Sequence, residues 1–306
     1  MKRKIFIIGN PVAGGGSLTK IKRAEVFLEA KGHDVKLMLT QKKGDAELFS
    51  REIGKGGHEQ ALVIAAGGDG TYNEVANGLL YSDVPMAIVP LGTTSVLAHE
   101  LGIPYDIEKA AAIALAGNVR TIHMGKITCT AAGNQETGNS SSTVRHFLLM
   151  AGIGFDGETV FGISEKIKQF AGKGAYILSG VRALMRYNPL PLTIKSDNFP
   201  LMTGYNAIIS KAACYGGSFK ITPDAKLTEP FLYAFVTHKK GRFDLLGYVS
   251  GIVKRRPYGL KDVSFFRAAE IEINGQAHIQ IDGDYAGTTP AKIEVVPEAL
   301  RLVFGD

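Results

Sequence analysis

Short apolar runs alternate with segments of helical spacing through the N-terminal part of the chain. The apolar runs predict strands at residues 5–8, 34–39, 61–66 and 87–90. Apolar residues at helical spacing predict helices between them, at residues 18–31 and 45–54. Parallel strands need crossover connections, which helices usually supply. The alternation therefore predicts a mostly parallel sheet covered by helices on both faces, in an α/β domain of residues 1–122.

The pattern changes after residue 121, where strand-like runs dominate. We predict strands at residues 123–130, 146–151, 192–196, 206–211, 232–237, 270–273, 278–281 and 293–296. Two amphipathic helices interrupt them at residues 175–187 and 243–256, and the small polar residues of 132–143 are typical of a surface loop. Residues 123–306 are therefore predicted to form a second domain, an antiparallel sheet or β-sandwich.

Composition narrows the class of function. The 306 residues carry a formal net charge of +6, which suits anionic ligands or an anionic membrane surface. Tryptophan is absent and no nucleic-acid-binding motif is present, so nucleic acid is not an expected partner. The two cysteines form no CxxC pair and no pattern with histidine, which is typical of a cytoplasmic protein. No apolar stretch approaches the roughly 20 residues of a membrane helix, so we expect membrane contact to be peripheral at most.

A glycine turn with an internal carboxylate, GGDG at residues 67–70, follows the third predicted strand. Its glycines allow a sharp turn and a close backbone approach to a ligand. Thr71 and Glu74 match the capping box that begins a helix. A bare phosphate would repel Asp69, so the carboxylate is useful beside Mg²⁺ or as the base that accepts a hydroxyl proton. The turn is therefore either a plain strand-to-helix connection or part of a phosphoryl-transfer site.

Two common nucleotide motifs are excluded. The chain contains no GxxxxGK[ST] sequence, so it is not a P-loop protein. Its first glycine loop, GNPVAGGGS at residues 9–17, lacks the GxGxxG spacing. The second strand is followed by Thr40, where a Rossmann dinucleotide site has an acidic residue. We therefore do not expect a hydride-transfer enzyme.

A third glycine loop, PLGTT at residues 90–94, follows the fourth predicted strand. Polar or glycine-rich loops thus come after the first, third and fourth strands. The carboxyl ends of parallel strands meet at one edge of a sheet, and ligands bind at that edge. The sequence therefore predicts a ligand site where these three loops meet.

The sequence IDGDYAG near the C-terminus places Asp282 and Asp284 on either side of a glycine. Asp-Gly between two strand-like runs is a strong signal for a two-residue β-hairpin turn. A functional role for the two carboxylates is the alternative, and the residues alone leave both interpretations open.

These motifs together resemble the diacylglycerol kinase catalytic family, which includes sphingosine and ceramide kinases and soluble bacterial lipid kinases. They occur in family order along nearly the whole chain. The matching segments are Asn10-Pro11 with its glycine loop, GGDGTYNE at 67–74, PLGT at 90–93, GIGFD at 152–156, GGSF at 216–219, PDA at 223–225, DGD at 282–284 and PEAL at 297–300.

The resemblance implies an NAD kinase/diacylglycerol kinase-like fold, with an N-terminal nucleotide-binding domain and a C-terminal β-sandwich for the lipid. In such folds the last strand, here about residues 297–306, often returns to the first domain. The resemblance also implies ATP and Mg²⁺ as cofactors, with ATP in the cleft between the domains. The residues that it assigns to the ATP phosphates are Asn10, Gly14, Gly15, Gly16, Ser17, Thr40, Gly67, Gly68, Asp69, Gly70, Thr71, Tyr72, Asn73, Glu74 and Thr93.

Two catalytic residues follow from the same resemblance. Asp69 is predicted to act with Mg²⁺ near the γ-phosphate. Asp284 occupies the acidic position of the family's Asp-Gly-Glu motif and is predicted to be the base for the lipid hydroxyl.

The chain departs from the family pattern at three places. Ser95 stands where the family usually has asparagine, and Asp284 stands where it usually has glutamate. The segment TEPFL at residues 228–232 replaces a common Asp-Asp-Gly-Leu-Leu, where relatives can bind a structural Mg²⁺ partly through backbone carbonyls. Glu229 is the side chain that we predict as a metal ligand there.

Both predicted helices of the second domain combine apolar residues with cations. An apolar face with cationic edges suits docking on anionic lipid, and packing of the same apolar residues on the sandwich is the alternative. The residues are Lys173, Tyr176, Leu178, Val181, Arg182, Leu184, Met185 and Arg186 in one helix, and Phe243, Leu245, Leu246, Val249, Ile252, Val253, Lys254, Arg255 and Arg256 in the other.

The expected function is that of an ATP- and Mg²⁺-dependent lipid kinase acting on diacylglycerol or a related lipid at a membrane surface. An NAD kinase-like enzyme is one alternative, because it shares the GGDG turn. A degenerate binder of nucleotide or lipid without turnover is the other, because of the three departures. Either a monomer or a homodimer is compatible with the sequence.

Overall fold

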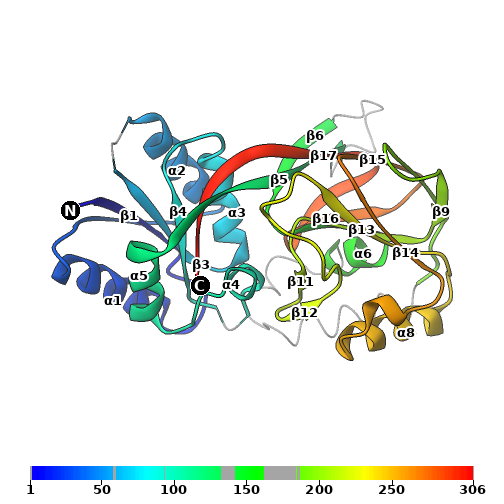
Figure 1. Cartoon of the computed structure of the whole chain (residues 1–306), viewed down its shortest axis with the longest axis horizontal. Coiled ribbons are helices and arrows are strands. Elements are labelled where there is room, and N and C mark those ends of the chain that lie inside the picture. Colours follow the sequence, from blue (N-terminus) through cyan, green and yellow to red (C-terminus); the bar gives the residue numbers. More distant parts are fainter. Residues whose placement is uncertain are drawn as a thin grey trace.

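The computed structural model describes residues 2–57, 60–92, 94–131, 142–161, 184 and 187–305. Two parts lie side by side in Figure 1, one with helices around a sheet and one dominated by strands. The strands β5 (Asn118–Ala131) and β17 (Asp284–Phe304) run from one part to the other. Within the described residues, no helix has the length and apolar character needed to cross a bilayer.

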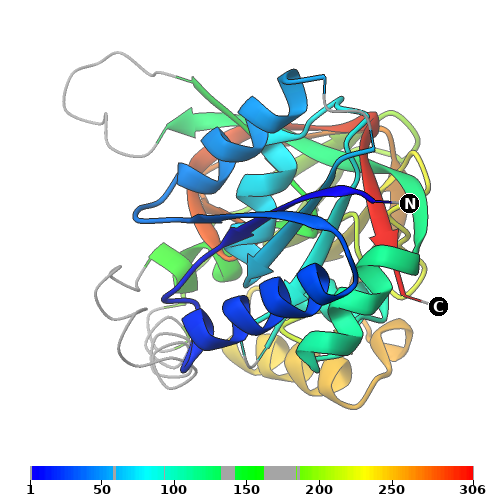
Figure 2. The ribbon, with the colours of Figure 1, turned by 90° about the vertical axis from the view of Figure 1, so that its left-hand side faces the viewer.

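Four parallel strands form the sheet of the first part, in the order β4-β3-β1-β2. β3 and β4 are buried along their whole length, which is typical of strands with helices on both faces. α1 packs with α5 on one face, and α2 packs with α3 on the other (Figure 2). The elements are β1 (Lys4–Gly9), α1 (Ser17–Ala30), β2 (Asp34–Leu39), α2 (Asp45–Lys55), β3 (Leu62–Gly67), α3 (Asp69–Gly78), β4 (Met86–Pro90), α4 (Val96–Leu101) and α5 (Ile107–Ala116).

The second part is antiparallel. β14, β13, β10, β7, β16 and β17 pair in that order, while β15, β8 and β9 extend from β17, and β6 pairs with β5. Alternate strand residues point inward to a separate core that includes Ile127, Ile209 and Ile271. The elements are β6 (Ser142–Phe147), β7 (Met150–Ile153), α6 (Phe155–Phe161), β8 (Leu192–Ser196), β9 (Met202–Gly204), β10 (Asn206–Ser210), β11 (Cys214–Tyr215), β12 (Phe219–Lys220), β13 (Leu232–Thr237), α8 (Arg242–Val253), η1 (Pro257–Gly259), β14 (Val263–Ala268), β15 (Glu270–Asn274) and β16 (His278–Ile281).

β17 connects the two parts. It pairs with β5 along almost the full length of both strands, from Gly287 opposite Ala131 to Phe304 opposite Asn118. Near its end, Leu302 pairs in parallel with Met86 of β4, so the last strand lies at the edge of the first sheet.

We propose that the boundary between the two domains lies within β5, close to residues 122 and 123. Ile122 and Met124 belong to the core of the first part, whereas Ile127 and Cys129 belong to the second core.

Three elements differ from the prediction. Residues 146–151 belong to two strands, β6 and β7, because the chain turns between them. Residues 293–296 are the middle of the 21-residue β17. The GIGFD motif leads into a short helix, α6, that the sequence did not predict. The predicted surface loop at 132–143 and the predicted helix at 175–187 lie largely outside the described residues.

Candidate active site

Loops from four strands meet at the carboxyl edge of the parallel sheet, as the strand order requires. Main-chain hydrogen bonds join them in pairs. The Thr40 N–H donates to the Gly9 carbonyl at 2.9 Å, and the Leu91 N–H donates to the Gly67 carbonyl at 3.0 Å. The Asn10 N–H donates to the Ala66 carbonyl at 2.9 Å and joins the two pairs, so the loops that follow β1, β2, β3 and β4 are held together as one surface.

The first glycine loop shapes the start of α1. Gly16 precedes the helix with a φ of 71°, a left-handed conformation that favours glycine. Ser17 is buried and its hydroxyl donates to the Gly14 carbonyl at 2.7 Å. The Asn10 side-chain oxygen accepts the Val12 N–H at 3.0 Å, and its side-chain nitrogen donates to the Thr71 hydroxyl at 3.5 Å. Asn10 therefore joins this loop to the first turn of α3.

The loop after β2 carries cations that the sequence analysis did not single out. The Asp45 carboxylate accepts the N–H groups of Gln41 and Lys42, at 2.8 and 3.0 Å, and these bonds lower its pKa. The loop is held so that Lys43 reaches across to the second part. The available signal was the pair of adjacent lysines, Lys42 and Lys43, that follows Thr40 after one residue.

The GGDG turn begins α3 one turn earlier than the capping box predicted. The helix starts at Asp69, so Thr71 is buried within its first turn rather than at its N-cap. A Cβ on Gly67 would lie 2.5 Å from the Thr71 hydroxyl, which explains the glycine. Tyr72, predicted to face ATP, is fully buried and donates its hydroxyl to the Gly67 carbonyl at 2.8 Å. Its side chain therefore supports the turn from behind.

Asp69 binds the start of another helix. Its carboxylate accepts the N–H of Val96 at 3.0 Å and that of Leu97 at 3.1 Å, which are the first two residues of α4. Ser95 is the N-cap of the same helix, and its hydroxyl accepts the Ala98 N–H at 3.1 Å. Burial raises the pKa of Asp69, and the two main-chain N–H groups act in the opposite direction. The carboxylate thus joins the GGDG turn to the loop after β4.

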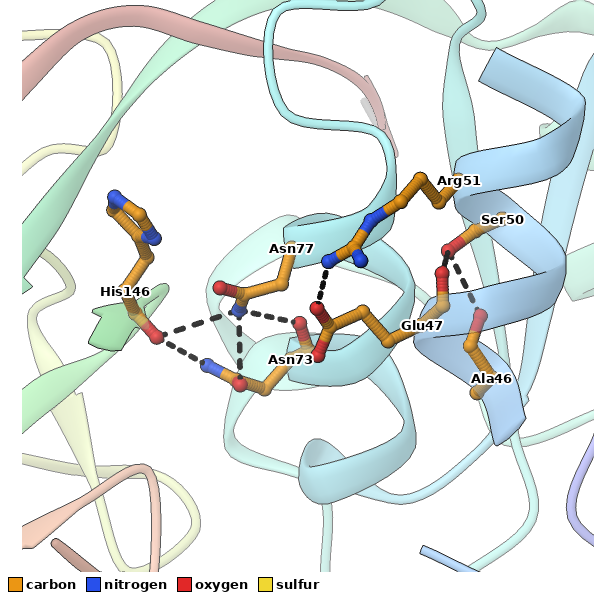
Figure 3. A network of polar contacts seen from close by, with 7 residues as sticks. All are labelled: Ala46, Glu47, Ser50, Arg51, Asn73, Asn77 and His146. Carbon is orange, nitrogen blue, oxygen red and sulfur yellow. Dashed lines mark hydrogen bonds and ion pairs between the residues drawn. The ribbon is translucent and has the colours of Figure 1, made fainter. Parts of the chain in front are cut away.

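The end of the GGDGTYNE motif faces the second part. Figure 3 shows the carboxamides of Asn73 and Asn77 on α3 reaching the main-chain carbonyl of His146, at 3.1 and 3.4 Å. Asn73 also donates to the Asp282 carboxylate at 2.8 Å. Two motifs that lie 209 residues apart therefore meet directly.

Glu74 lies beside the N-terminus of α2. Burial raises the pKa of Glu74, while the N–H groups of Gly44 and Ala46 and the Lys43 cation act in the opposite direction. The Asp284 carboxylate raises that pKa slightly further.

The DGD motif forms the hairpin turn that the sequence predicted, and it also belongs to the site. Asp282 and Gly283 both have positive φ, 47° and 88°, and join β16 to β17 as a two-residue turn. Asp282 is half-buried, and its carboxylate accepts three successive main-chain N–H groups at 2.8–2.9 Å, from Leu148, Leu149 and Met150.

Asp284 is the accessible carboxylate of this turn. It pairs with Lys43 at 2.6 Å, and the two side chains are 38% and 57% exposed. The predicted base of the second part therefore contacts the loop that follows β2 in the first part.

A chain of partly buried polar side chains supports the DGD turn from the other side. The Gln280 side-chain oxygen accepts the Gly283 N–H at 2.8 Å, and its nitrogen donates to Asp156 at 2.6 Å. Tyr215 donates its hydroxyl to the same carboxylate at 2.6 Å. The aspartate of the GIGFD motif thus acts on the turn through Gln280.

The predicted metal ligand Glu229 lies apart from these loops. Its carboxylate accepts Lys226 Nζ at 2.9 Å and the Tyr233 hydroxyl, so the geometry does not fit a metal at this side chain. Among the described residues, no three His, Cys, Asp or Glu side chains are grouped as metal ligands. Thr93, another predicted phosphate contact, lies outside the described residues.

Comparison with known proteins agrees with this arrangement. The model of the diacylglycerol kinase catalytic domain matches residues 4–127, and that of the YegS C-terminal NAD kinase beta sandwich-like domain matches residues 150–304. A diacylglycerol kinase of Bacillus subtilis (strain 168) is 28% identical over 99% of this chain and 96% of its own length. One from Mycobacterium tuberculosis (strain ATCC 25618 / H37Rv) is 27% identical over 98% and 94%.

Solved structures agree as well. A Bacillus anthracis str. Sterne structure, assigned as a diacylglycerol kinase, has a TM-score of 0.79 and 26% identity, and the match covers 99% of this chain and 95% of that one. The two matched domains follow in the expected order, which confirms the predicted fold class. The chain therefore belongs to the diacylglycerol kinase catalytic-domain family, a family of lipid kinases.

Proposed function

We propose that this lipid kinase uses ATP and Mg²⁺ and transfers the γ-phosphate to a hydroxyl of diacylglycerol or a related lipid. The observation that carries the proposal is the Lys43–Asp284 pair at 2.6 Å. It puts a carboxylate of the β-sandwich next to a cation of the loops at the carboxyl edge of the parallel sheet. Phosphoryl transfer needs such positioning and charge neutralisation more than covalent chemistry by the protein.

In the proposed step, the lipid hydroxyl oxygen forms a bond to the γ-phosphorus. The bond between that phosphorus and the β–γ bridging oxygen breaks, and ADP leaves with the electron pair. The hydroxyl proton moves to the Asp284 carboxylate. Lys43 neutralises phosphate charge, and the glycine loop before α1 and the turn before α3 offer main-chain N–H groups to the phosphate oxygens.

Mg²⁺ supplies further neutralisation of the phosphate charge when it is bound. Asp69 is the acidic side chain that we propose near it. In the structure its two oxygens already accept the N–H groups of Val96 and Leu97, so its part in holding α4 competes with metal binding. The neighbouring Glu74 carboxylate, half-buried beside Lys43 and Asp284, is the alternative ligand.

The test is transfer of labelled γ-phosphate from ATP into a panel of lipids in mixed micelles, with and without Mg²⁺. The panel contains diacylglycerol, monoacylglycerol, phosphatidylglycerol and a long-chain base, and a parallel reaction contains NAD. We expect Mg²⁺-dependent labelling of one lipid class. Label in NAD alone would indicate an NAD kinase.

An inactive preparation that still binds ATP would instead favour the degenerate binder. In that case the Asp284→Glu variant, which restores the family residue, separates the possibilities. A large gain of lipid phosphorylation would indicate a weakened native site, whereas continued inactivity would contradict the proposal.

We also propose that α8 brings the enzyme to an anionic membrane surface. Leu245 and Tyr248 pack against the protein, which accounts for part of the apolar residues of this helix. Phe243 is 88% exposed, and Leu246, Val249 and Val253 are about half exposed. These four residues follow at intervals of three or four and therefore share one helix face.

Cations flank both ends of this apolar face. Lys239 and Lys240 precede α8, and residues 254–256 follow it as Lys-Arg-Arg. An apolar face with cationic ends is complementary to the headgroups and acyl chains of an anionic bilayer.

Sedimentation with vesicles tests this surface. We expect the Phe243→Ser/Leu246→Ser protein to bind phosphatidylglycerol-rich vesicles at least about tenfold more weakly than the wild type, since each buried apolar side chain contributes roughly 1.5–3 kcal/mol. Activity on a short-chain, water-dispersed substrate is the control and should be unchanged. Equal vesicle binding by both proteins would contradict the role of α8.

A further inference from the structure

Lys211 is a fully buried lysine directly after β10. Its ammonium group donates to three main-chain carbonyls of one turn, those of Lys226 at 3.4 Å, Glu229 at 2.5 Å and Phe231 at 2.7 Å. Burial lowers the pKa of Lys211 to about 8. An ammonium has three N–H donors, and the turn presents three carbonyls.

Carbonyl oxygens that converge on one point require a positive charge between them, because each carries partial negative charge and is removed from water. Proteins use such carbonyl sets to hold metal ions. Here the nearby carboxylate of Glu229 turns away, toward Lys226 and Tyr233. The ammonium therefore occupies the position that a metal would need, and the expected metal at Glu229 does not fit.

The turn that carries these carbonyls lies at the junction of the two parts. The His123 N–H in β5 donates to the Leu227 carbonyl at 2.8 Å. On the other side, the Lys211 N–H donates to the Leu149 carbonyl at 2.8 Å, and the Leu149 N–H in turn donates to Asp282. Lys211 is therefore connected, through the main chain of Leu149, to Asp282 in the hairpin turn that precedes Asp284.

We propose that the Lys211 ammonium is a built-in cation that replaces a bound metal ion in the 226–231 turn and fixes this turn at the domain junction. Removal of the side chain then leaves a cation site of defined shape. The atoms beyond Cβ, three carbons and the nitrogen, correspond to n-propylammonium, which is therefore the ligand that the emptied site should take.

The first experiment measures Tm after exhaustive chelation with EDTA and again with added Mg²⁺. It uses the Asp69→Asn/Glu74→Gln protein, which lacks both proposed Mg²⁺ ligands of the active site, because Mg²⁺ bound there would itself raise the Tm. A built-in cation predicts the same Tm in both conditions. A fall in Tm on chelation that Mg²⁺ reverses in this variant would show that a metal outside the active site holds the fold, and would overturn the proposal.

The second experiment is chemical rescue of Lys211→Ala. We expect this variant to lose roughly 5–10 °C in Tm, because three buried carbonyls lose their partner. Millimolar n-propylammonium should restore several degrees through binding to the folded state alone. Propanol, which has the shape without the charge, and tetramethylammonium, which has the charge without N–H donors, should not.

Lys226→Ala is the matched control. It removes an exposed lysine from the same turn and leaves the three carbonyls and Lys211 in place, so its Tm should stay near that of the wild type. Its response to n-propylammonium should equal that of the wild type. An unchanged Tm for Lys211→Ala, or rescue that propanol gives equally well, would refute the built-in cation.

If Lys211→Ala does not remain folded in buffer, its refolding yield from urea replaces Tm as the readout. A yield that rises with n-propylammonium but not with propanol supports the proposal, and equal yields overturn it. None of these measurements uses kinase activity, so their outcome is independent of the substrate assignment.

Discussion

The GGDG turn after β3 and the DGD turn before β17 look alike in sequence, yet the DGD turn carries a second, more accessible aspartate that the GGDG turn lacks. Asp69 and Asp282 each accept several main-chain N–H groups from other segments and are largely withdrawn from solvent. Asp284 is partly exposed and faces Lys43. Aspartates in glycine turns therefore occur in two settings in this protein, as holders of neighbouring segments and as an accessible carboxylate, for which we propose the proton-transfer role.

We expect the largest effect of a substitution at Asp284, on activity. We expect Asp284→Asn to lower kcat by roughly 10²–10⁴-fold, the usual contribution of a general base. Its stability should change by about 1 kcal/mol or less, since an exposed ion pair contributes little. Kinase assays and urea unfolding measure the two effects. Asp284→Glu keeps the carboxylate and is the control; full activity of Asp284→Asn would exclude the base.

For Asp282, in contrast to Asp284, we expect the main effect of a substitution on stability. Asp282→Ala leaves three buried N–H groups without their acceptor, and we expect the free energy of unfolding to fall by roughly 3 kcal/mol at about 1 kcal/mol for each. Asp282→Asn keeps one acceptor oxygen and should lose less. Urea unfolding measures both. Wild-type stability in Asp282→Ala, combined with lost activity, would show that the carboxylate acts on substrate instead.

For Asp69 we expect a loss of stability between those at Asp284 and Asp282, together with a loss of activity. Asp69→Ala removes the acceptor for two N–H groups at the start of α4, so the free energy of unfolding should fall by about 2 kcal/mol. Activity should also fall, because the loop after β4 loses its anchor. Ser95→Ala is the matched control: it removes the N-cap of the same helix and one hydroxyl hydrogen bond to Asp69 at 3.3 Å, but leaves the Asp69 carboxylate in place.

The pair of measurements on Asp69 separates its two proposed roles. Loss of activity with unchanged stability would assign Asp69 to Mg²⁺ and the phosphates. A folded Asp69→Ala protein with full activity would exclude it from both the chemistry and the positioning of the loop.

Among these aspartates we expect the smallest effect on stability at Asp45, and the pH dependence of stability tests it. The N–H groups of Gln41 and Lys42 hold its pKa below the unfolded value of 3.8, so its stabilising contribution is present above that pH and is lost as the pH falls through the folded pKa. The wild type should therefore exceed Asp45→Asn in stability near neutral pH, and the difference should shrink in acid. A difference that stays constant by urea unfolding down to about pH 3 would contradict a role for the charge.

Much of the fold follows from local patterns. The parallel part was predictable because its strands are short apolar runs between helices of regular spacing, and the hairpin at residues 282–283 because Asp-Gly accepts positive φ. The capping box failed because Gly67 and Gly68 allow the helix to begin directly after the strand. Lys20 was also missed; its Nζ reaches the Leu91 carbonyl at 3.3 Å, and nothing in its own helix signals that contact.

The sequence by itself determined the chemistry that was available: glycine turns at strand ends, aspartates within them, and lysines after the second strand. Tertiary structure decided which of these groups are accessible. The N–H partners of Asp282 lie 132–134 residues away, and those of Asp69 lie 27–28 residues away. Burial and hydrogen-bond partners are properties of segments brought together by folding, and for this reason no local pattern separates a carboxylate that holds a loop from one that receives a proton.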